Sequence, residues 1–152
     1  RYTRRQDQVK DARTRHMRGR CAINCGLGSL MHASSTLDSQ LAAVIDMFEA
    51  GQLDRALQLA QRLCDSHPDV AIVHNVLGVI AAEQGALQAA IDSYRRALAL
   101  EPDNCDVHFN LGNALRDKGD LDAALASYRC ALRIRPHDPD MVFNLAVVLR
   151  AR

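Results

Sequence analysis

The sequence predicts an all-α protein in which pairs of antiparallel helices stack side by side. Three observations lead to this prediction: a 34-residue repeat, apolar residues at helical spacing, and glycine and proline at fixed places in each repeat. Residues 71–104 and 105–138 align without a gap and share 14 of their 34 residues. A fixed period of this length is typical of repeat proteins, whose units bury their apolar faces only by stacking on one another.

The repeat extends in both directions from this central pair. Residues 37–70 form a more divergent unit in the same register, with glycine, leucine and proline at the places they occupy in the next unit. Residues 139–152 begin a further unit, which is partial. We therefore predict a repeat domain over 37–152, with units at 37–70, 71–104 and 105–138 and a partial unit at 139–152.

Each unit is predicted to be two helices, because its apolar residues recur at steps of three and one, which mark one face of a helix. A glycine between the two halves can take the left-handed conformation that ends a helix. These glycines are Gly51, Gly85 and Gly119. A proline closes each second helix and an acidic or amide residue follows that can cap the next one. The prolines are Pro68, Pro102 and Pro136, and the capping candidates are Asp69, Asp103 or Asn104, and Asp138.

Small residues stand where two helices are expected to approach closely. In the first helices these are Gly78, Gly112 and Ala146, and in the second helices Ala56, Ala90 and Ala124. Tyr94 and Tyr128 recur one period apart on the apolar face of the second helices, so we expect both to lie in the interior.

The charge divides the chain into two parts. Residues 1–36 hold eight Lys and Arg against two Asp, a net charge of +6, whereas 37–152 hold eleven against sixteen acidic residues, or −5. We interpret 1–36 as a basic, disordered tail, which could also be translated upstream sequence ahead of Met31. An organellar transit peptide or an arm that touches nucleic acid are the alternatives. The negative charge of the repeats themselves disfavours nucleic acid as a partner.

Nothing in the sequence indicates catalysis, a cofactor or a metal site. Nucleotide-binding loops, HExxH helices and nucleophile elbows are missing. The five cysteines are an odd number without framework spacing, which fits a reducing cytoplasm, and Cys21 and Cys25 lack the spacing of a zinc pair. His74 and His108 recur one period apart, too far to share a metal, so we expect them to pack at the edge of the core. No apolar run is long enough to span a membrane.

The repeats resemble the tetratricopeptide repeat family. The residues that carry the likeness in the third unit are Leu111, Gly112, Leu115, Gly119, Ala124, Tyr128, Ala131 and Pro136. Those of the second unit are Leu77, Gly78, Ala90, Tyr94, Ala97 and Pro102. The chain departs from the family pattern at His74, His108 and Ala81. The resemblance implies a right-handed α-solenoid of antiparallel helix pairs, whose first helices line a concave groove that holds peptides or other proteins.

Residues 108–136 are most similar to the repeats ahead of O-linked N-acetylglucosamine transferases and related bacterial transferases. In those proteins a ladder of asparagines one unit apart binds the backbone of an extended peptide. Asn110 and Asn144 match two positions of this ladder. Val76 and Ala42 interrupt the ladder upstream. The carboxylate clamp of chaperone-binding members is disfavoured, since Leu41, Asp140 and Asn144 stand where its cations belong.

We therefore predict a protein-interaction module that binds a peptide or protein in this groove and is not an enzyme. The candidate binding residues are Asn75, Phe109, Asn110, Asn113, Arg116, Asp117, Phe143, Asn144 and Arg150. Upstream, the groove is expected to be apolar, with Leu41, Ile45, Phe48, Ile72 and Val79. Val76 and Val79 of the second unit are replaced by Asn110 and Asn113 in the third. We expect this difference to determine how a partner is recognised. The alternative is a targeting arm of a larger transferase, either a glycosyltransferase or a sulfotransferase, whose catalytic domain lies outside this chain.

The last predicted helix carries apolar residues without a second helix to cover them. These residues are Leu145, Val148 and Leu149. Because solenoids need capped ends, we expect the chain to self-associate through this helix.

Overall fold

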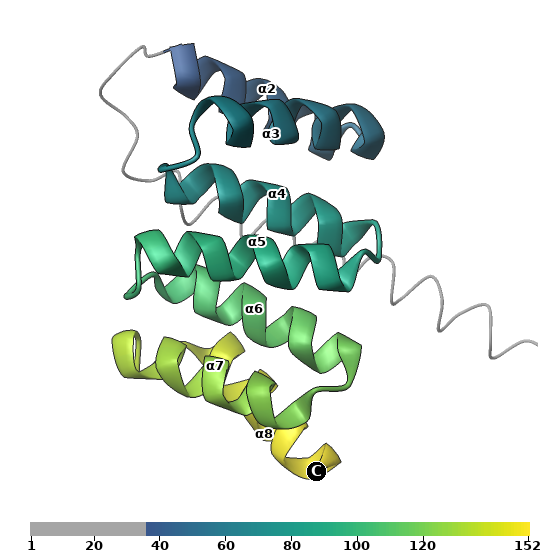
Figure 1. Ribbon diagram of the computed structural model, residues 1–152. Helices are drawn as coiled ribbons and strands as arrows, with labels where there is room; N and C mark the ends of the chain where they lie inside the picture. Colours follow the sequence, from purple (N-terminus) through teal and green to yellow (C-terminus); the bar gives the residue numbers. More distant parts are fainter. Residues whose placement is uncertain (1–35) are drawn as a thin grey trace, which may run out of the picture.

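The computed structural model describes residues 36–152, which form seven α-helices joined by short turns (Figure 1). The helices are α2 (Thr36–Glu49), α3 (Leu53–Ser66), α4 (Ala71–Glu83), α5 (Leu87–Leu100), α6 (Cys105–Lys118), α7 (Leu121–Ile134) and α8 (Pro139–Ala151). The all-α prediction is confirmed. Thr36, assigned to the tail by the sequence, is the first residue of α2; the predictions for the rest of the tail, including Cys21 and Cys25, lie outside the described residues.

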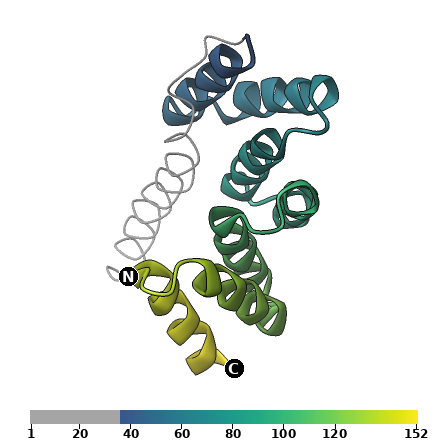
Figure 2. The same ribbon diagram turned by 90° about the vertical axis from the view of Figure 1, so that its left-hand side faces the viewer.

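The helices pair as the repeat predicts. Within the three full units α2 packs on α3, α4 on α5 and α6 on α7, and each second helix also packs on the first helix of the next unit. In addition α4 contacts α6 and α6 contacts α8, so these neighbouring first helices touch one another. Viewed from the side, the stack follows a curve with the first helices along its inside (Figure 2). We call α2, α4, α6 and α8 the inner layer and α3, α5 and α7 the outer layer.

The turn between the two helices of each unit depends on glycine. Gly51, Gly85 and Gly119 have φ angles of 73°, 78° and 92° and are the only described residues with positive φ. A side chain with a Cβ rarely adopts this left-handed conformation, which confirms the role that the sequence predicts for these residues.

Among helices α3 to α8, side-chain N-caps are present at α6, α7 and α8. Asn104 accepts a hydrogen bond from the Val107 amide, and Asp138 accepts from the amides of Asp140 and Met141. Asp120 caps α7 in the same way. The expectation for Asp69 is wrong, because α4 starts one residue later: its N-cap is Val70, which has no side-chain acceptor. Pro139 occupies the first turn of α8.

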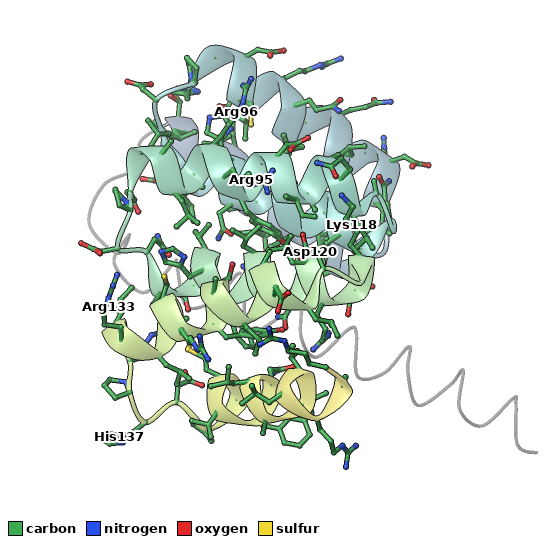
Figure 3. The ribbon with its side chains drawn as sticks, turned by 60° about the horizontal axis from the view of Figure 1, so that its bottom comes forward. Arg95, Arg96, Lys118, Asp120, Arg133 and His137 are labelled. Atoms are coloured by element: carbon green, nitrogen blue, oxygen red, sulfur yellow. The ribbon has the colours of Figure 1, made fainter. Side chains whose placement is uncertain are left out.

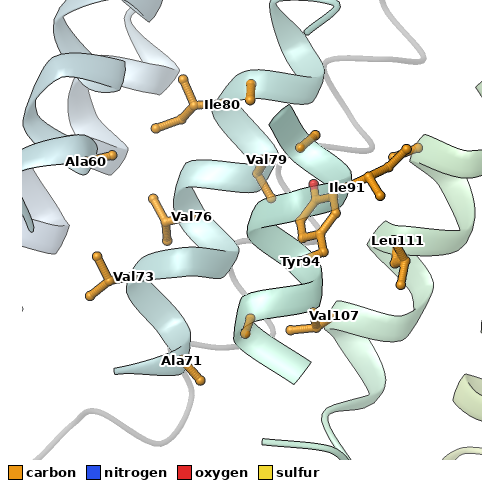
Figure 4. Close-up of a cluster of buried hydrophobic side chains, with 14 of the residues drawn as sticks. Ala60, Ala71, Val73, Val76, Val79, Ile80, Ile91, Tyr94, Val107 and Leu111 are labelled. Carbon is orange, nitrogen blue, oxygen red and sulfur yellow. The ribbon is translucent and has the colours of Figure 1, made fainter. Parts of the chain in front are cut away.

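One continuous apolar core runs through the stack, from Leu41 in α2 to Val148 in α8. Figure 4 shows its central part, where Val73, Val76 and Ile80 of α4 face the preceding unit and Tyr94 of α5 lies against α4. The small residues Ala56, Ala90 and Ala124 are completely buried. This layout explains why the residues shared between units are mostly small or apolar.

Tyr94 and Tyr128 are buried against a glycine of their own unit, as predicted for interior aromatics. A Cβ added to Gly78 would lie 2.5 Å from Cε1 of Tyr94, and one added to Gly112 would lie 2.6 Å from Cε1 of Tyr128. The tyrosine ring therefore occupies the space into which the Cβ of any residue other than glycine would project.

We expect Ala124→Leu to lower the free energy of unfolding by about 1 to 3 kcal/mol, because extra methylene groups overpack a close helix contact. The matched control is Ala126→Leu, since Ala126 is exposed on the same helix. Urea denaturation of both variants measures the difference. An unchanged midpoint for Ala124→Leu would contradict the close approach of α7 to α6.

The last helix differs in part from the expectation. Leu149 is 50% exposed and Leu145 is half-buried, but Val148 is completely buried in the core, so its prediction as an uncovered residue is wrong. Val148 lies on the side of α8 that packs on the preceding unit. Ala146, predicted at a close helix contact, is exposed.

Candidate functional site

The helices of the inner layer carry a net negative charge, and those of the outer layer carry a net positive charge. Its four helices hold seven acidic and three basic residues, a net −4, whereas the outer helices hold four acidic and six basic residues, a net +2. Neither α2 nor α4 contains a Lys or Arg. Arg95 and Arg133 are two of the exposed cations on the outer helices (Figure 3). The two layers therefore present different surfaces to a partner.

The inner layer also holds a pair of buried carboxamides that joins two units. Asn110 Nδ2 in α6 donates a hydrogen bond to Asn75 Oδ1 in α4 at 3.2 Å. Asn75 is 3% exposed and Asn110 is 6% exposed. The sequence predicts a break in the asparagine ladder at Val76. The preceding residue, Asn75, provides a carboxamide beside Asn110 instead.

A second polar link joins α6 to α8. The Arg116 guanidinium donates from Nη1 to Asn144 Oδ1 at 2.6 Å, and from Nε and Nη2 to Asp117 Oδ1 at 2.9 and 2.7 Å. The side chain of Arg116 is only 15% exposed. Asn144 in turn donates from Nδ2 to the carbonyl oxygen of Asp140. These contacts hold the side chains of Arg116 and Asn144 in defined positions.

Asn113 has a different surrounding from the other asparagines. Its Oδ1 atom accepts a hydrogen bond of 2.8 Å from the hydroxyl group of Tyr128 in α7. The equivalent residue of the second unit is Val79, which is buried. The change from Val79 to Asn113 therefore supplies a hydrogen-bond acceptor for a tyrosine hydroxyl group within the third unit. A role of Asn113 in recognising a partner protein stays a prediction.

The remaining candidates are spread over α6 and α8. Phe109 is half-buried with its ring centroid 6.0 Å from that of Tyr128, whereas Phe143 is 63% exposed. Arg150 is exposed. Upstream, Ile45 and Ile72 are half-buried, but Leu41, Phe48 and Val79 are buried in the core. Fewer apolar side chains of α2 and α4 are therefore accessible than the sequence predicts.

A sequence profile of the tetratricopeptide repeat matches residues 41–104, 88–139 and 109–152, which together cover most of the chain. The chain belongs to the tetratricopeptide repeat family. A search of curated protein sequences finds no match.

Several solved structures superpose well on this one. A crystal structure of MamA has a TM-score of 0.71 at 21% identity, covering 76% of this chain and 63% of that chain. The type III secretion chaperone SycD of Yersinia enterocolitica, in complex with a peptide of the translocator YopD, has a TM-score of 0.71 at 20% identity, covering 79% and 98%. The O-GlcNAc transferase of Thermobaculum terrenum has a TM-score of 0.71 at 27% identity, covering 78% of this chain but 23% of that chain.

The two histidines that depart from the family pattern tie tetratricopeptide units together. Nε2 of His74 lies 2.9 Å from the carbonyl oxygen of Pro68, and Nε2 of His108 lies 2.8 Å from that of Pro102. A carbonyl oxygen only accepts, so Nε2 carries the proton in both rings. Each histidine thus fastens the loop that ends the preceding unit, in line with the predicted packing at the edge of the core.

The Cys64 thiol lies beside this first histidine, with Sγ 3.7 Å from His74 Nδ1. Burial, with a smaller effect of Asp65, raises the pKa of Cys64 to about 11. Because the thiolate is the reactive form of cysteine, this thiol is held in its unreactive state at neutral pH.

Two further findings concern the described residues as a whole. Within 36–152, no three His, Cys, Asp or Glu side chains come together in a way that could hold a metal ion. Every helix in this range is too short or too polar to cross a lipid bilayer.

Proposed function

We propose that this tetratricopeptide domain binds an extended segment of a partner protein along its inner layer and does not itself catalyse a reaction. The observation that supports the proposal is the row of carboxamides on successive inner helices, from Asn75 and Asn110 to Asn144. A carboxamide offers both a donor and an acceptor, which matches the peptide group of an extended backbone. The peptide-bound SycD structure shows that a domain with this fold can hold a peptide.

The proposal is tested with a peptide selected against the 152-residue chain from a random display library. We expect the Asn110→Ala, Asn144→Ala double variant to bind this peptide at least about tenfold more weakly, because an unpaired backbone group costs about 1 to 3 kcal/mol. Fluorescence anisotropy with labelled peptide measures the dissociation constants.

The matched control removes two exposed carboxamides from the outer layer. Gln58→Ala, Gln61→Ala changes the same chemical groups on α3, where both residues face solvent. We expect it to bind like the original chain. Equal affinity of the inner-layer variant, with thermal unfolding showing that it is folded, would contradict the proposal.

The second candidate function is a targeting arm of a larger transferase. It is favoured by the 27% identity to the Thermobaculum terrenum enzyme, of which this chain spans 23%. Sequencing the reading frame beyond Arg152 tests it. A transferase domain downstream supports the arm, and a frame that holds only further repeats or a stop codon contradicts it.

A further inference from the structure

The inner helices of the three full units carry an acidic residue at one fixed position in their last turn. Glu49 is the last residue of α2, Glu83 is the last residue of α4, and Asp117 stands at the same position of α6. Each follows the one before by 34 residues. Equivalent positions of successive units recur along one edge of a stack of repeats. We call Glu49, Glu83 and Asp117 the carboxylate row.

The carboxylate row belongs to the same layer as the carboxamides of the proposed site. Asp117 follows Asn110 by seven residues, which is about two turns of helix, so both side chains leave the same face of α6. Glu83 holds the equivalent position of α4. A peptide that lies along the carboxamides therefore has the carboxylate row to one side of its backbone.

The third unit shows what a carboxylate in this row binds. The Arg116 guanidinium donates to Asp117 Oδ1 from Nε at 2.9 Å and from Nη2 at 2.7 Å. The first two units lack this arginine, because Phe48 and Ala82 stand at its position. Neither α2 nor α4 contains a Lys or Arg. Among the residues that the structure describes, none forms an ion pair with Glu83.

The helix ends increase the negative potential around the first two carboxylates. The last carbonyl groups of a helix give its carboxyl end a partial negative charge, which favours a cation there and disfavours an anion. The last turn of α6 contains Arg116 and Lys118, whereas the last turns of α2 and α4 contain no basic residue. Glu49 and Glu83 therefore stand where a positive charge is favoured and where their own helices supply none.

We propose that the partner segment is basic and that its arginine side chains bind Glu49 and Glu83. Each guanidinium takes the place that Arg116 takes in the third unit. The inference rests on the proposed function, which places an extended peptide along the carboxamides. Alternate side chains of an extended peptide point to the same side, so arginine at every second position faces the carboxylate row. Arginine suits this contact because its planar fork donates two hydrogen bonds to a carboxylate.

Two short peptides of opposite charge test the preference for a basic partner. One alternates arginine with serine, and the other alternates glutamate with serine. Fluorescence anisotropy at low salt measures the binding of each labelled peptide to the 152-residue chain. We expect the arginine peptide to bind at least about tenfold more tightly, because like charges across an interface are strongly unfavourable. Equal affinities, tighter binding of the glutamate peptide or no binding of the arginine peptide would overturn the inference.

The place of the contact is tested with the Glu49→Gln, Glu83→Gln double variant, which keeps the size of both side chains and removes their charge. We expect it to bind the arginine peptide at least about threefold more weakly, since each exposed ion pair contributes modestly. The matched control, Asp65→Asn, Asp92→Asn, removes two charges from exposed residues of the outer helices α3 and α5. Equal weakening by both double variants, or none by the first, would overturn the assignment to the carboxylate row.

The peptides selected from the random library separate this inference from the proposed function. Selected peptides rich in arginine support the inference. Selected peptides rich in Asp and Glu that bind through Asn110 and Asn144 would overturn the inference and leave the proposed function standing. Selected peptides whose binding does not change in the Asn110→Ala, Asn144→Ala variant would overturn the proposed function, and the inference with it.

Discussion

We expect Tyr128→Ala to lower the free energy of unfolding by about 3 to 5 kcal/mol, the range measured when a large buried aromatic is truncated. Tyr128 is completely buried, and its ring fills the space above Gly112. Its hydroxyl group donates to Asn113. The substitution therefore opens a cavity between α6 and α7 and also removes the partner of a carboxamide.

Tyr128→Phe separates these two losses. The phenylalanine ring keeps the packing and removes only the hydroxyl group, so we expect a loss of about 1 kcal/mol. Urea denaturation followed by circular dichroism measures both variants. Equal losses would contradict the account, because they would mean that the ring contributes nothing beyond its hydroxyl group.

Gly112→Ala should also destabilise the fold, although alanine is the better helix former by about 1 kcal/mol. The added Cβ would lie 2.6 Å from Cε1 and 2.8 Å from Cδ1 of Tyr128, and a fully buried ring has little room to move. We expect the overpacking to exceed the gain in helix propensity and to leave a net loss of about 1 to 3 kcal/mol.

Ala146 provides the internal comparison, because it occupies the equivalent position of α8 and is exposed. Ala146→Gly should destabilise by up to about 1 kcal/mol through helix propensity alone. The preferred residue is thus glycine at 112 and alanine at 146. Thermal unfolding of both variants checks this; a stabilised Gly112→Ala would show that the tyrosine ring does not require glycine.

The helix pairs could be predicted from the sequence because the determinants are local and repeat. Gly51, Gly85 and Gly119 each stand at a turn whose backbone requires positive φ, and the requirement recurs every 34 residues. The same argument places Tyr94 and Tyr128 in the interior. Such features depend on one unit and its immediate neighbour, so a single period contains the necessary information.

The polar contacts of the inner layer could be predicted only in part. The pairing of Asn75 with Asn110 joins positions that are not equivalent, and a comparison at one fixed period therefore misses it. The bond from Tyr128 to Asn113 was missed because Tyr94 is present in the second unit without an amide opposite. Both contacts depend on how one helix is rotated against another, which a repeat pattern does not specify.

The burial of Val148 shows a similar limit. Helical spacing identifies the apolar residues of α8 but not which side of the helix meets α7. The structure divides them, with Val148 buried and Leu149 half exposed.

The central claim, that the inner layer binds an extended peptide, is tested most directly by nuclear magnetic resonance. The side-chain amide signals of ¹⁵N-labelled chain are followed while the selected peptide is added. Binding along the inner layer should shift the signals of Asn75, Asn110 and Asn144, and should leave unchanged the signal of Asn104, which caps the start of α6. Shifts confined to Gln58 and Gln61 on the outer layer, with the three inner asparagines unmoved, would contradict the claim.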